Sequence, residues 1–136
     1  MITLPIDLEL ILERGHVRPL GACDLIYDPQ DPYAVLLLIV DDLHGTEVAW
    51  LMARELFANG LGSQTEPRAG DVRIWRCNEL EMHIALESPE GRAELHAPAE
   101  DIAHFLELTY QAVPPGHEMD GVDIGAELAA MFGEAA

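Results

Sequence analysis

An uninterrupted apolar run, AVLLLIV at positions 34–40, follows a turn-forming segment, YDPQDP at 27–32. Successive side chains of a strand point to opposite faces of its sheet, so a strand with one wet face alternates apolar and polar residues. This run does not alternate, and both faces of the strand therefore need cover. In a chain of only 136 residues, part of that cover can come from another copy of the chain.

Alternating apolar and polar residues predict further short strands on both sides of this run. The longest alternating segment spans residues 2–12, and Pro5 within it predicts a sheet edge or a bulge, because proline cannot donate to a strand ladder. A turn at 42–45 returns the apolar run to the strand that follows it. The other predicted strands span 21–27, 47–51, 71–76, 82–87 and 92–97.

Three helices are predicted between and after these strands. Residues 52–59 are good helix formers and stop at Gly60, while 98–112 carries an apolar stripe at helical spacing. A third helix is expected over 122–132. Strands followed by a helix occur twice, which predicts an α+β fold of antiparallel sheets. The length predicts one domain over residues 1–136.

The charge of the chain narrows the classes of partner. It has 25 acidic residues against 7 basic ones, for a net charge of -18, and every basic residue is arginine. Phosphate backbones and anionic membrane surfaces both attract proteins through Lys and Arg, so this balance argues against either partner. The N-terminus has no cationic region before an apolar core, and the two cysteines have no metal-finger spacing. We expect a cytoplasmic protein with reduced thiols and no cofactor or metal.

Three groups of residues could carry chemistry, and each has a simpler structural explanation. An acid–histidine row on the long helix is typical of a solvated helix face, and an acidic pair beside a histidine is typical of a hairpin turn. A cysteine and a histidine could form a nucleophile and its base, but no third orienting group is evident. We therefore expect no enzyme. The groups are Glu100, His104, Glu107 and Gln111; Asp41, Asp42 and His44; and Cys77 with His83.

Other residues suggest packing or contact with partners. Arginines in the middle of the chain could form a docking patch, although ion pairing with the many carboxylates is favoured: Arg54, Arg68, Arg73 and Arg76. Trp75 could be a core residue or an interface anchor. Four apolar residues are expected in the core or in an oligomer contact, namely Val35, Leu37, Ile39 and Trp50.

The turn-forming segment and the start of the apolar run also carry a family resemblance. YDPQDPYAV at 27–35 resembles the YDxxDPYAV signature of the SsgA-like proteins, actinobacterial regulators of sporulation and cell division. Nearly the whole chain follows the family pattern in order, and AVPPG at 112–116 places it closest to the SsgB branch. Residues 1–21 and 77–83 match least. The other matching segments are Trp50, AREL at 53–56, GL at 60–61, GDVRIW at 70–75, IALESPEG at 84–91, AP at 97–98 and FL at 105–106.

The resemblance implies a fold and a function. The fold is expected to be a bell-shaped homotrimer similar to the Whirly single-stranded nucleic-acid-binding proteins. The expected function is non-enzymatic: to mark septum sites, recruit FtsZ there and promote its assembly. An SsgA-like relative and membrane-associated division proteins are the other expected partners. The rival hypothesis is a single-stranded nucleic-acid-binding module, which needs a basic groove with aromatic platforms that this composition does not favour.

The segment Pro114, Pro115 and Gly116 is the leading candidate for partner binding. A Pro-Pro-Gly sequence can simply end a helix, but between two helices it also forms a rigid, exposed loop that can present residues to a partner. Weaker candidates for the same role are Arg54, Arg73 and Trp75.

Overall fold

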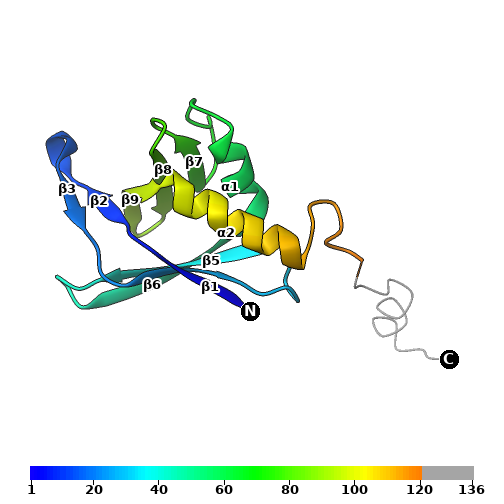
Figure 1. Cartoon of the computed structure of the whole chain (residues 1–136). Coiled ribbons are helices and arrows are strands. Elements are labelled where there is room, and N and C mark those ends of the chain that lie inside the picture. The colour runs from blue at the N-terminus through cyan, green and yellow to red at the C-terminus, as the bar shows by residue number, and fades with distance from the viewer. Residues whose placement is uncertain (121–136) are drawn as a thin grey trace.

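The computed structural model describes residues 1–120 and consists of two antiparallel β-sheets with two α-helices (Figure 1). The helix expected over 122–132 lies outside the described residues. The strands are β1 (Ile2–Ile6), β2 (Glu9–Ile11), β3 (Val17–Pro19), β4 (Cys23–Tyr27), β5 (Ala34–Asp41), β6 (Thr46–Ala53), β7 (Val72–Arg76), β8 (Glu81–Ser88) and β9 (Gly91–Pro98). The helices are α1 (Arg54–Leu61), α2 (Ala99–Ala112) and the short 3₁₀ helix η1 (Glu13–Gly15). The predicted α+β class with antiparallel sheets is confirmed.

The strands divide into a four-stranded sheet, in the order β1-β4-β5-β6, and a five-stranded sheet, in the order β3-β2-β9-β8-β7. The prediction of one strand over 2–12 is wrong, because the chain leaves the first sheet after Ile6 and enters the second at Glu9. Ile6 and Leu8 are both buried, so the apolar alternation continues through the corner and hides it. Pro5 does lie on an edge strand, as predicted.

The apolar run forms β5, which pairs with β4 on one side and β6 on the other. Val35 and Leu37 on its inner face are fully buried, and they pack in a core shared by both sheets and both helices. Leu36 and Leu38 on its outer face are only half-buried. Within the described chain, β5 therefore has full cover on one face and partial cover on the other.

Ile39 and Trp50 lie at the margin of the core. Both are partly buried and pack against it, unlike Val35 and Leu37. The hairpin of β5 and β6 extends to the pairs Val35–Met52 and Ala34–Ala53. The prediction that the helix begins at Met52 is therefore wrong, because pairing with β5 keeps residues 52–53 extended.

The longer helix, α2, is amphipathic as predicted. Ile102, Phe105, Leu106 and Thr109 are buried, and the helix runs between the five-stranded sheet and strand β1 of the other sheet (Figure 1). Both sheets and α2 thus contribute to one core.

An ion pair joins the two sheets at one end. Arg18 of β3 donates two hydrogen bonds of 2.9 Å to the carboxylate of Asp41, the last residue of β5. His44 Nδ1 lies 2.9 Å from the same carboxylate, and the Leu43 N–H donates to it. These contacts hold the pKa of Asp41 well below its usual range, with the Arg18 hydrogen bonds as the largest cause. The Asp41–His44 segment thus has a structural role in the turn, which agrees with the interpretation favoured from the sequence.

Close packing of α1 against β7 depends on Gly60. A Cβ atom at Gly60 would lie 2.7 Å from the carbonyl oxygen of Ile74 and 2.8 Å from its Cγ2. Gly60 lies within α1, and Gly62 forms the C-cap. The prediction that Gly60 follows the end of the helix is wrong. Glycine is needed at this position because a side chain would prevent the close contact between α1 and β7.

We predict that Gly60→Ala lowers the free energy of unfolding by roughly 1–3 kcal/mol, because the new methyl group overpacks a contact made partly by backbone. Gly62→Ala is the matched control, since its Cβ would meet only the Asn59 carbonyl oxygen, at 3.8 Å. Urea unfolding of the two variants measures the difference. Equal stability of both variants would contradict the close-packing argument.

Candidate partner-binding surface

Arg54, the first residue of α1, is a buried cation. Its side chain is 4% exposed, and one guanidinium nitrogen donates to the Val113 carbonyl at 2.7 Å. The same nitrogen lies 3.4 Å from the Thr109 carbonyl oxygen, and the other donates to Glu118 Oε2 at 3.0 Å. Arg54 therefore joins the start of α1 to the end of α2 and to the loop beyond it.

Two tyrosines enclose this cation. The guanidinium carbon lies 5.3 Å from the ring centre of Tyr27 and 5.0 Å from that of Tyr110, distances at which a cation is attracted to a ring face. Tyr27 donates its hydroxyl to the Pro32 carbonyl at 2.9 Å, and the Arg54 N–H donates to the Tyr33 carbonyl at 2.7 Å. The turn before β5 is thus tied to the same centre.

The predicted Pro-Pro-Gly loop forms a tight turn directly beside this network. The His117 N–H donates to the Pro114 carbonyl at 3.0 Å, and Gly116 has φ +86°. Proline at the second position and glycine with positive φ at the third are the features of a type II turn. Among the described residues, nothing lies within 4 Å of a Cβ built at Gly116, so the turn faces open space there.

Grooves lie on both sides of this turn. One groove, of about 410 Å³, separates the turn from α1, and the other, of about 450 Å³, separates it from the turn before β5. Tyr33, with 53% of its surface exposed, lines the first groove. The remaining residues of the first groove include Ala58, Asn59, Tyr110 and Pro115, and those of the second include Pro29, Gln30, Val113 and His117.

Glu118 completes the ion pair with Arg54 and has a lowered pKa. The largest cause is a hydrogen bond from its own backbone N–H, and the Arg54 guanidinium adds to the effect against the opposing effect of burial. The carboxylate form of Glu118 is therefore favoured by the folded state. Neither Glu118 nor the tyrosines that enclose Arg54 were predicted from the sequence, because these contacts join segments far apart in the chain.

The other two predicted partner-binding residues lie elsewhere, on β7. Arg73 pairs with Glu66 at 3.3 Å and with Glu87 at 3.5 Å, and Trp75 stacks on His83 with ring centres 4.2 Å apart. The structure therefore does not bring Arg73 and Trp75 together with the Pro114–Gly116 turn. Burial leaves Arg54 unable to present its side chain to a partner, whereas the turn itself is accessible.

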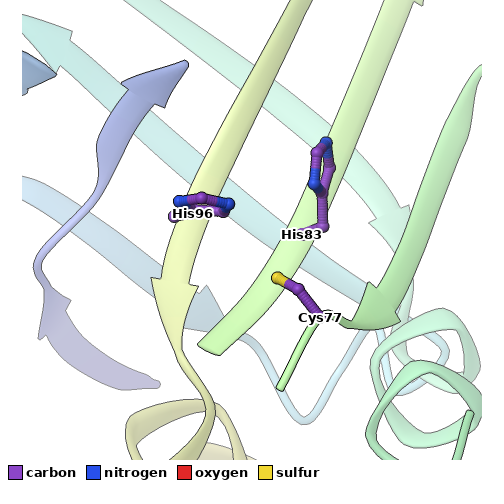
Figure 2. Close-up of side chains that lie close together, drawn as sticks. All are labelled: Cys77, His83 and His96. Atoms are coloured by element: carbon purple, nitrogen blue, oxygen red, sulfur yellow. The ribbon is translucent and has the colours of Figure 1, made fainter. Parts of the chain in front are cut away.

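A second cluster, on the five-stranded sheet, contains Cys77, His83 and His96 (Figure 2). The sequence suggested Cys77 with His83 as a nucleophile and base. Burial raises the pKa of the Cys77 thiol and lowers the pKa of His83, whereas an activated cysteine needs a lowered pKa. His96 was not predicted, since only the register of β8 with β9 places it opposite His83.

The acid–histidine row on α2 faces away from the core. Glu100, His104, Glu107 and Gln111 are all exposed, which confirms the interpretation of this row as a solvated helix face. No helix among residues 1–120 is long and apolar enough to cross a membrane.

Comparison with known proteins shows which family the sequence matches. Residues 12–118 match the family described as "Streptomyces sporulation and cell division protein, SsgA". The chain is 41% identical to the sporulation-specific cell division protein SsgB of Thermobifida fusca, over 94% of this chain and 92% of that protein. It is 38% identical to SsgB of Streptomyces coelicolor, over 98% and 96% of the two chains.

Solved structures give the same result. A crystal structure of an SsgA-like sporulation-specific cell division protein from Thermobifida fusca matches with a TM-score of 0.77 and 39% identity, covering 96% of this chain and 94% of that one. A structure from work on SsgB mutations and longitudinal cell division in sporulating Streptomyces coelicolor also has a TM-score of 0.77, at 38% identity over 88% and 93% of the chains.

We predict that Arg54→Met destabilises the fold by roughly 3 kcal/mol, because it leaves Glu118 without its cation and the Val113 carbonyl without the Arg54 donor. Arg54→Lys should lose less, since it keeps the charge but not the planar fork. Arg92→Met, at an exposed arginine, is the control and should change little. Urea unfolding measures all three, and a wild-type midpoint for Arg54→Met would refute the role of Arg54.

We predict that the stability difference between the wild type and Glu118→Gln depends on pH. A carboxyl group with a lowered folded-state pKa stabilises the fold fully above its ordinary value of 4.5, and this contribution is lost as the pH falls through the folded-state pKa. The wild type should therefore be more stable than Glu118→Gln at pH 7, and the difference should shrink as the pH falls below 4.5. Urea unfolding at a series of pH values tests this, and a difference that does not shrink in acid would contradict it.

Proposed function

Because the chain belongs to the SsgA family of sporulation and cell division proteins, we propose that it is a non-enzymatic regulator of septation. In this proposal it marks future septum sites, recruits FtsZ to them and promotes FtsZ assembly. An SsgA-like relative and membrane-associated division proteins act with it at the septum. The observation that carries the proposal is similarity to proteins named SsgB along more than nine-tenths of both chains.

The turn formed by Pro114, Pro115 and Gly116 is the proposed contact with a division partner. It is exposed, and the Arg54 network below it holds both of its ends through Val113 and Glu118. A turn held in this way loses little conformational freedom on binding, which favours recognition. The grooves beside it offer an exposed aromatic ring, Tyr33, for a partner side chain.

The outer face of the four-stranded sheet is the proposed contact between copies of the chain, in a bell-shaped, Whirly-like trimer. Leu36 and Leu38 on β5 and Ile26 on β4 are half-buried there, and Leu51 on β6 is 64% exposed. The register places Leu36 directly between Ile26 and Leu51. A mainly apolar face of this kind is typical of an oligomer contact, and it would provide the second cover that β5 requires.

The nucleic-acid alternative has no support in the arrangement of the arginines. Arg18, Arg54 and Arg73 pair with carboxylates, and Arg76 donates to the carbonyl groups of Leu61 and Glu79. A single-stranded nucleic acid needs cations directed at its backbone. These four arginines of the described chain instead stabilise the fold.

We predict that this protein sediments with FtsZ polymers and increases the amount of polymerised FtsZ in the presence of GTP. Gly116→Val should weaken this association, since a β-branched residue strains the backbone at positive φ and changes the turn. Gly45→Val is the matched control: Gly45 also has positive φ, +64°, and open space around its Cβ position, but it lies in the turn between β5 and β6.

The pelleting experiment distinguishes function from fold. Loss of association in Gly116→Val, with a wild-type circular dichroism spectrum and oligomeric state, supports the turn as the contact. Absence of co-sedimentation for the folded wild-type protein would overturn direct recruitment of FtsZ. Equal binding by both glycine variants would move the contact to another surface.

We predict that Leu51→Glu reduces the oligomer to smaller species, because it places a charge on the proposed apolar contact. Leu43→Glu is the control, since Leu43 is exposed to a similar extent, 68%, but lies in the turn beyond β5. Light scattering after size-exclusion chromatography measures the mass of each variant. A wild-type protein that is monomeric at low micromolar concentration would contradict the proposed trimer.

A further inference from the structure

The outer face of the five-stranded sheet carries a row of chemically active side chains across four neighbouring strands. Trp75 of β7 lies opposite His83 of β8, His83 lies opposite His96 of β9, and His96 lies opposite Glu9 of β2. The same register places Ile74, Ile84 and Leu95 in the buried row on the other face. The alternation of the strands therefore directs both imidazole rings away from the core, onto one surface.

Cys77 adds a thiol to this row. It follows the end of β7, where its backbone N–H donates to the Glu81 carbonyl at 3.0 Å, and its side chain is exposed. One potential ligand atom from each of Cys77, His83 and His96 lies within 4.8 Å of the other two. The sulfur points toward the space beside the two rings (Figure 2). A small shift of three side chains would bring these atoms onto one ion.

Each imidazole ring also has a carboxylate next to one of its nitrogens. Glu94 Oε1 lies 3.7 Å from His83 Nε2, and Glu81 Oε2 lies 3.4 Å from His96 Nδ1. Neither contact is a hydrogen bond in this structure, but a carboxylate this close can accept one from a histidine that shifts to bind a metal, which leaves the other ring nitrogen as the ligand. The cluster thus has carboxylates near enough to support a metal site as well as three ligands.

A purely structural role explains the cluster less well. His83 stacks on Trp75 at an interplanar angle of 12°, but its Nε2 atom is buried and has no hydrogen-bond partner in the described chain. A histidine retained for local structure would normally satisfy such a nitrogen. Packing therefore accounts for the position of the His83 ring and leaves its Nε2 atom unexplained.

We propose that Cys77, His83 and His96 form a binding site for Zn²⁺ or a similar divalent transition metal. One thiolate and two imidazoles are ligands that zinc prefers, at about 2.3 Å for sulfur and 2.0–2.1 Å for nitrogen. The partial desolvation of the thiol does not oppose this, because a metal ion deprotonates a coordinating thiol. Three protein ligands leave a fourth tetrahedral position for water or for a ligand atom from another molecule.

The metal would link the β7–β8 connection, β8 and β9 through a single ion, whereas backbone hydrogen bonds join these strands only in neighbouring pairs. Cys77 lies in the β7–β8 connection, while the histidines lie on β8 and β9. Zinc at this place would therefore stabilise the edge of the five-stranded sheet. This site is independent of the proposed division partner, since none of its ligands belongs to the Pro114–Gly116 turn or to the outer face of the four-stranded sheet.

Cobalt titration of the untagged, reduced and metal-free full-length protein tests the proposal. We expect one Co²⁺ per chain, with the visible bands of a tetrahedral ion and a thiolate-to-cobalt charge-transfer band, and we expect Zn²⁺ to displace it. Cys77→Ser should remove the charge-transfer band, and His96→Gln should weaken zinc binding at least tenfold. Glu94→Gln, which alters only the supporting carboxylate, should weaken it by about 10–100-fold.

Matched controls separate this site from the many surface carboxylates. His104→Gln removes an exposed histidine from α2 and should leave the cobalt spectrum and the zinc affinity unchanged. Cys23 remains as a buried thiol in all these variants. Circular dichroism verifies that each variant is folded.

Two results would overturn the proposal. One is a cobalt spectrum of the wild-type protein that lacks the thiolate-to-cobalt band. Any bound ion would then belong to another set of ligands, such as Glu9, Glu81 and His96, which also lie close together. The other is zinc affinity that does not change in folded Cys77→Ser and His96→Gln variants.

Discussion

The burial of one arginine is the constraint on which the rest of this structure depends. Removing a guanidinium from water costs several kcal/mol unless hydrogen bonds and opposite charge compensate it. Arg54 obtains that compensation from Val113, Thr109 and Glu118, and from the faces of Tyr27 and Tyr110. The carbonyl of Val113, the C-cap of α2, lies beyond the hydrogen bonds of the helix, so the cation and this carbonyl satisfy each other. The four-stranded sheet, both helices and the following loop thereby share one centre.

The buried Arg54 network and the exposed Pro114–Gly116 turn have different roles. Arg54 lies beneath the surface and fixes the ends of the Pro114–Gly116 turn, while the turn itself remains accessible. Of the two arginines on β7, Arg73 pairs with Glu66 of the preceding loop and Glu87 of β8, and Arg76 donates to nearby carbonyl groups. In a chain with so few cations, four of the seven arginines stabilise the fold, namely Arg18, Arg54, Arg73 and Arg76.

The two sheets present different chemistry on their outer faces, although they enclose one core. The four-stranded sheet has leucines on its outer face because β5 is apolar on both sides. The five-stranded sheet instead has a tryptophan, two histidines and acidic residues there. The first face is the proposed contact between copies of the chain, and the second carries the proposed metal site. The exposed turn after α2 is the proposed contact with a division partner.

The sequence by itself determined the α+β class, most strands, the amphipathic helix α2 and the family. Periodicity and turn residues are local properties, and a family signature is read directly from residue order. Only the tertiary structure decided that the segment 2–12 is divided between two sheets, since Ile6 and Leu8 remain in step across the corner. It also decided that Arg54 is buried rather than exposed, and that His96 lies beside His83. Burial and strand register depend on contacts between residues far apart in the chain, and no local pattern encodes which distant residue will be the partner.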